Sequence, residues 1–117
     1  MGAVEPLRLA AVSSHPRHDL VGRITEVLSE SGWVLDARPF SNLALAIHFE
    51  LSRRQLPGMT ARLAALPMAW SDPSLAALSR LEGTPLPDLP ETIPGSLHIT
   101  FRHLEPDRPS EVPAVPG

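Results

Sequence analysis

The segment HPRHD, residues 15–19, places two histidines, an arginine and an aspartate within five positions. Imidazole, guanidinium and carboxylate groups can bind anions, hold metal ions or transfer protons. Two chemistries fit this spacing. His15, His18 and Asp19 are three metal-ligand types in one short loop, whereas Arg17 and His18 can pair with an anion. A structural interpretation is also open, in which Asp19 caps a following helix and its neighbours face solvent.

A second group of polar side chains follows from strand alternation. In residues 43–51, large apolar residues alternate with small or polar ones, which is typical of a half-buried strand, and residues 96–104 repeat the pattern. The side chains expected to point away from the core are His48, Glu50, His98, Thr100 and Arg102. We expect this face to be either an interface with another protein or a solvated surface.

The elements that must position these groups begin with a strand over residues 7–14. Residues 20–31 carry apolar side chains at three- and four-residue spacing, which predicts an amphipathic helix. Asp19 is a suitable cap at its start, and Gly32 is a suitable residue after its end. A second strand follows over residues 33–40.

The second half of the chain predicts a helix in two pieces, over residues 56–66 and 71–83. Pro67 ends the first piece, and Ser71 or Asp72 caps the second. Residues 83–95 contain four prolines and read as an extended linker before the last strand.

The element order is therefore strand, helix, strand, strand, helix in two pieces, strand. This order predicts an α+β, ferredoxin-like βαββαβ fold, with a four-stranded antiparallel sheet and both helices on one face. In that strand order His48 and His98 would lie about 10 Å apart, two strand spacings, which is too far for one metal ion. We expect one domain over residues 1–104 and a flexible, proline-rich C-terminal tail over residues 105–117.

The composition of this chain of 117 residues argues against some classes of binding partner. Its net charge is −3, its ten bases are all arginine, and the only basic pair is Arg53–Arg54. This balance argues against a nucleic acid or an anionic membrane surface as a partner. The absence of cysteine excludes disulfides and thiolate chemistry. Neither a signal peptide nor a membrane-spanning stretch is evident, so we expect a cytoplasmic protein.

Residues 7–51 resemble the ACT domain family. Members tend to show an Asp-x-Pro-Gly turn, an amphipathic helix ending in glycine, a strand opening with Asn-Ile, and an acid-Ala-Arg run. The matching residues here are Asp19, Leu20, Val21 and Gly22 for the turn, Gly32 for the helix end, and Asp36, Ala37 and Arg38 for the run. Two positions depart from the family pattern: Val21 replaces the turn proline, and Val34–Leu35 replaces Asn-Ile.

The resemblance implies a small, non-catalytic regulatory domain that senses an amino acid or another small acid and forms a homodimer. The ligand would bind at the turn between the first strand and helix, where free N–H groups and the helix dipole attract an anion. The residues assigned to this site are Arg17, His18, Asp19, Leu20, Val21 and Gly22. The alternative is a protein-interaction or assembly module that acts through its open sheet face without a small ligand.

Other motifs that carry chemistry are missing from the sequence. It has no glycine-rich phosphate loop, no nucleophile elbow around Ser13 and Ser14, and no evident pair of acid/base carboxylates. Trp33 and Trp70 are expected to pack in or around the core. The sequence therefore predicts no enzyme activity, no cofactor and no metal site.

Overall fold

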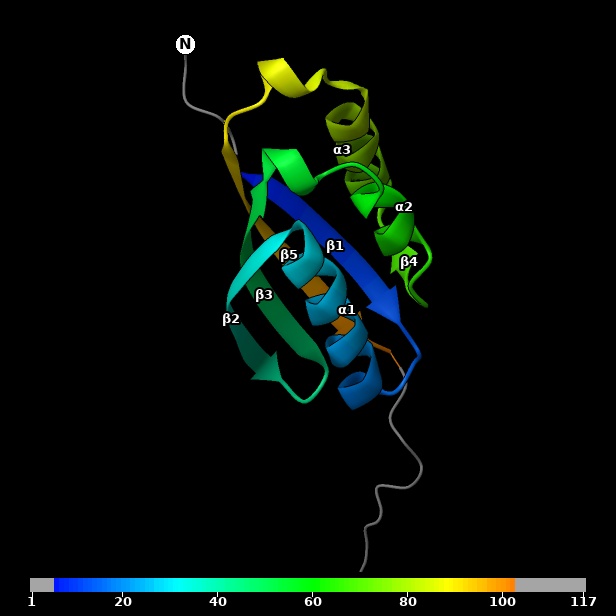
Figure 1. The fold of residues 1–117 in the computed structure, drawn as a ribbon. Helices are drawn as coiled ribbons and strands as arrows, with labels where there is room; N and C mark the ends of the chain where they lie inside the picture. Colours follow the sequence, from blue (N-terminus) through cyan, green and yellow to red (C-terminus); the bar gives the residue numbers. More distant parts are fainter. Residues whose placement is uncertain (1–5, 103–117) are drawn as a thin grey trace, which may run out of the picture.

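Residues 6–102 are the part of the chain that the computed structural model describes, and they form a five-stranded sheet with three α-helices (Figure 1). The strands are β1 (Leu7–Ser13), β2 (Gly32–Ser41), β3 (Ala44–Ser52), β4 (Ala69–Trp70) and β5 (Thr92–Phe101). The helices are α1 (Arg17–Ser31), α2 (Met59–Ala64) and α3 (Asp72–Gly83), with short 3-10 turns at Arg53–Gln55 and Leu86–Asp88. The α+β class is confirmed.

The sheet itself differs from the predicted four-stranded antiparallel arrangement. Its order is β2-β3-β5-β1-β4, so the last strand lies between β3 and β1 rather than beyond β1. β5 runs antiparallel to β3 but parallel to β1, and the short strand β4 forms one edge. The sheet is therefore mixed.

The outer edge of β1 explains why the last strand does not lie there. β4 pairs with β1 at Ala11 and Val12. One residue earlier, the backbone N–H of Ser71 donates to the carbonyl of Ala10. The Ser74 hydroxyl accepts from the Ala10 N–H at 2.7 Å and donates to its carbonyl at 3.2 Å. Backbone groups that an edge strand would need are thus already satisfied, which leaves β5 to pair on the other side of β1.

The two faces of the sheet are unequal. Helix α1 lies across one face, with α2 and α3 beside it towards the β1 edge (Figure 1). Side chains of α1, α2, α3 and alternate strand positions share one core: Leu7, Leu9, Leu20, Ile24, Leu28, Leu45, Ile47, Phe49, Leu51, Leu56, Met59, Leu63, Leu78, Ile93, Leu97, Ile99 and Phe101. The opposite face of β2, β3, β5 and β1 carries the strand side chains that alternate with these core residues. We call it the open face.

Two local predictions at the ends of α1 are corrected. Helix α1 begins at Arg17 after Pro16, without a side-chain cap, so Asp19 lies in its first turn rather than at the cap. Gly32 is not a left-handed cap: its φ of 169° is extended, and it opens β2 directly. A Cβ there would lie 2.0 Å from the carbonyl oxygen of Glu50, so close backbone packing requires glycine.

In the second half, Ser71 is the one of the two predicted cap residues, Ser71 and Asp72, that caps α3, and it accepts a hydrogen bond from the N–H of Ser74. The expected linker over residues 83–95 is partly strand, because β5 already begins at Thr92 and includes Pro94. The expected tail over residues 105–117 lies outside the described residues. No helix within residues 6–102 has the length and apolar character needed to cross a membrane.

Candidate functional site

The predicted ligand-binding turn is held together by contacts within the chain. His15 Nε2 lies 2.6 Å from Asp19 Oδ2, and Arg23 Nε lies 3.2 Å from the same oxygen. The hydrogen bond from His15 is the main cause that lowers the pKa of the Asp19 carboxyl, and Arg23 adds to it. The Asp19 carboxylate therefore binds two neighbours on its own helix turn instead of capping the backbone.

Arg17, the residue expected to pair with an anion, faces the hairpin between β2 and β3. Its Nη1 donates to the carbonyl of Asn42 at 2.9 Å, and its guanidinium lies 5.5 Å from the ring centre of Phe101. Arg17 thus fastens the start of α1 to the end of the sheet.

The remaining residues of this predicted site are divided between core and solvent. Leu20 is fully buried, Val21 is half-buried and His18 is exposed. Gly22 lies exposed within the helix, where an added Cβ would meet nothing within 4 Å. Four surface hollows in the described part of the chain are lined by residues outside 17–22. Ligand binding at this turn stays a prediction.

The geometry of the same loop does not support the interpretation that it binds a metal ion. Among residues 6–102, no group of three histidine or acidic side chains is placed to hold a metal ion. The His15–Asp19 contact does not extend to His18.

The second predicted cluster comes together on the open face, with one exception. His48 and Glu50 of β3 share this face with His98 and Thr100 of β5. Arg102 follows the end of β5, where its N–H donates to the carbonyl of Ser13. It borders a separate small hollow beside residues 67–69.

The predicted separation of the two histidines is wrong, because it assumed that β1 lies between β3 and the last strand. β3 and β5 are direct neighbours: His48 is in register with Ser96, and His98 with Ala46. The histidines therefore lie diagonally across adjacent strands. His48 Nδ1 also lies 2.8 Å from Asp36 Oδ1 on β2, so the Asp-Ala-Arg run used for the family resemblance contributes a carboxylate to this face.

Large apolar side chains lie on the open face at its β2 side. Trp33 is in register with Glu50 and is 44% exposed, and Leu35, 54% exposed, sits in a bulge of β2. Phe40 is 64% exposed, and its ring centre lies 5.5 Å from that of His98. The prediction that Trp33 packs in or around the core misses this exposure.

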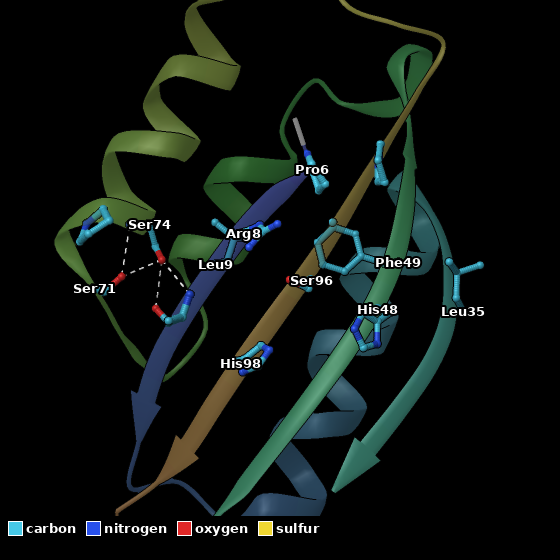
Figure 2. Close-up of a pocket in the computed structure, with 14 residues that line it drawn as sticks. Pro6, Arg8, Leu9, Leu35, His48, Phe49, Ser71, Ser74, Ser96 and His98 are labelled. Atoms are coloured by element: carbon cyan, nitrogen blue, oxygen red, sulfur yellow. Dashed lines mark hydrogen bonds between the residues drawn. The ribbon is translucent and has the colours of Figure 1, made fainter. Parts of the chain in front are cut away.

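A hollow of about 750 Å³ lies on the same face, in the volume range of small-molecule sites (Figure 2). Its lining comes from all four long strands and from the start of α3: Pro6, Arg8, Leu9, Ala10, Leu35, His48, Phe49, Ser71, Pro73, Ser74, Pro94, Gly95, Ser96 and His98.

Sequence reasoning found the two histidines of this hollow and missed Arg8 and Ser96. The signal for Arg8 was present, because the alternation of Leu7, Leu9 and Ala11 turns Arg8 towards the open face. Nothing local indicated that Ser96 lies beside Arg8, since their pairing joins residues far apart in the chain.

Comparison with family models gave no match to this chain, and neither did comparison with curated proteins or with solved structures. The resemblance to the ACT family therefore stays a prediction that rests on the sequence motifs alone.

Proposed function

We propose that this chain is a non-catalytic assembly module that pairs with a second copy of itself through the open face. The observation that carries the proposal is the group of exposed Trp33, Leu35 and Phe40 on a sheet face that none of the helices within residues 6–102 covers. Exposed apolar patches of this kind commonly mark interaction surfaces.

The sheet edges are less suited to association than the face. The β1 edge is occupied by β4 and by the start of α3. The β2 edge contains two register shifts and Pro39, which cannot donate a ladder hydrogen bond. Bulges and proline are the features that keep an edge strand from pairing with another chain. Face-to-face packing is the remaining mode.

A second copy is a suitable occupant because the face carries both basic and acidic side chains. The centre of the face carries small side chains that project little from the sheet, those of Ala10, Ala44 and Ala46. Arg38 is basic and Glu50 is acidic, so a two-fold pair can bring opposite charges together. Four strands of about eight residues cover roughly 500 Å² of surface per copy. Two copies together reach roughly 1,000 Å², the lower bound of a specific interface.

The test is the mass of the full chain in solution, measured by sedimentation equilibrium over a range of protein concentrations. We expect the parent chain to approach the mass of a dimer, and Phe40→Glu and Trp33→Glu to shift it towards the monomer. Ser29→Glu adds the same charge at an exposed position of α1 and should leave the dimer intact. A parent chain that stays monomeric, or a Ser29→Glu effect equal to that of Phe40→Glu, refutes the proposal.

A further inference from the structure

The hollow on the open face forms where the side chains at its centre are small. Ser96 lies in the middle of it, with Arg8 of β1 in register on one side and His48 of β3 on the other (Figure 2). His98 follows two residues later on β5, flanked by Ala10 and Ala46. Three side chains that can carry positive charge thus surround one serine hydroxyl.

The residues that line this hollow include an arginine and no acidic residue, in a chain that is negative overall. The lining also contains two histidines, and the net charge of the chain is −3. Arg8 has no ion-pair or hydrogen-bond partner among residues 6–102. An unpaired guanidinium at the edge of a hollow is well suited to bind a carboxylate through two parallel hydrogen bonds.

The polar groups at the start of α3 do not compete for this role. The hydroxyl of Ser74 is used by the backbone of Ala10, and that of Ser71 by the N–H of Ser74. Pro73 has no N–H to offer. His48 is likewise engaged, because its Nδ1 lies 2.8 Å from Asp36 Oδ1. The polar side chains left for a ligand are therefore Arg8, Ser96 and His98.

The walls of the hollow are mainly apolar. Leu35 rises from the bulge of β2, and Pro73 and Pro94 close two further sides. A ligand that fills this space needs an apolar body in addition to its charge, because bare hydrated anions gain nothing from such walls.

We propose that this hollow binds a small carboxylate with a compact apolar body, held by Arg8 and His98 across Ser96. The site is distinct from the predicted turn at residues 17–22, and all its residues belong to one chain. It does not depend on assembly, although in a face-to-face pair the ligand would lie between the two copies.

The experiment is an NMR titration of the full ¹⁵N-labelled chain with three probes: benzoate, its neutral counterpart benzamide, and inorganic phosphate. We expect benzoate to shift the amide signals of Ser96 and its neighbours with a dissociation constant of about 1 mM or below. Benzamide and phosphate should each bind at least about tenfold more weakly, since one lacks the charge and the other the apolar body. Because Arg8 also borders a neighbouring hollow beside Arg80, the shifts are judged at Ser96.

The matched variants are Arg8→Gln and Arg54→Gln, which remove an exposed arginine inside and outside the hollow. Arg8→Gln should weaken benzoate binding at least about tenfold, and Arg54→Gln should leave it unchanged. Equal binding of benzoate and benzamide, binding of phosphate as tight as benzoate, absence of shifts at Ser96, or equal effects of the two variants would each overturn the proposal. Sedimentation of the same samples separates this result from the assembly proposal, since either can fail while the other holds.

Discussion

Replacing Gly95 with alanine should destabilise the fold through one identifiable clash. A Cβ at this position would lie 2.4 Å from Cε1 and 2.5 Å from Cζ of Phe49, and 3.1 Å from the carbonyl oxygen of Leu7. Ordinary contacts between carbon atoms are about 3.5–4.0 Å, so the ring must move by more than about 1 Å. Phe49 is fully buried, so its ring can shift only if the core side chains packed around it shift as well.

The expected cost can be estimated from two opposing effects. Overpacking a well-packed core costs about 1–3 kcal/mol, and this contact falls in the upper half of that range. Removing a glycine from a strand returns about 0.5–1 kcal/mol of backbone entropy. The net loss of stability for Gly95→Ala is therefore about 1–2.5 kcal/mol. In a domain of this size such a loss lowers the melting temperature by roughly 4–20 °C.

Gly22→Ala is the control, because the same chemical change is made where an added Cβ meets no atom within 4 Å. Gly22 lies within α1, where alanine is favoured over glycine by about 0.5–1 kcal/mol, so this variant should be more stable than the parent. The assay is urea unfolding followed by tryptophan fluorescence at one fixed protein concentration, since any self-association makes stability depend on concentration. Unchanged stability of Gly95→Ala, or equal losses in both variants, would refute the packing argument.

Two further predictions concern single hydrogen-bonded groups. Ser74→Ala leaves the N–H of Ala10 without its partner at the sheet edge, while the Ala10 carbonyl keeps the bond from the Ser71 N–H, and should cost about 1–3 kcal/mol in urea unfolding, whereas Ser79→Ala on the exposed side of α3 should cost little; equal effects would contradict the edge role. His15→Ala should raise the pKa of the Asp19 carboxyl towards its ordinary value, because the largest cause that lowers it is removed. NMR titration of that carboxyl measures the change, and an unchanged pKa would contradict the assignment. Since the folded pKa is lowered, this contact stabilises the fold above the ordinary pKa of aspartate, and the contribution is lost as the pH falls through the folded value.

The elements themselves were largely predictable, because their signals are local. The helical spacing in residues 20–31 and the strict alternation in residues 43–51 place α1 and β3 almost where they lie. Residue type alone predicted Ser71 or Asp72 as the cap of α3, and Ser71 is the cap. Predictions were wrong where a residue distant in the sequence determines the local structure. Gly32 is an example, because glycine is required there by the close approach of the Glu50 backbone and not by a helix cap.

Only part of the candidate site could be predicted, because the sequence carries local signals and not the pairing of distant strands. Alternation assigns His48 and His98 to the open face, and it assigns Arg8 there equally well. It does not say which strands are neighbours, so the gathering of Arg8 and His48 around Ser96 could not be predicted.

The sequence by itself determined the approximate positions of the α-helices and of the four long strands, and which side of β1, β3 and β5 faces the core, because periodicity acts within a few residues. It placed HPRHD just before a helix, whereas the helix begins within that segment at Arg17, and Asp19 contacts His15 and Arg23. Only the tertiary structure decided the strand order, because Ser71 and Ser74 occupy the edge of β1 and leave the place beside β3 to β5. That order brings Arg8 of β1, His48 of β3 and His98 of β5 to one hollow, since strand pairing joins residues that no local pattern connects.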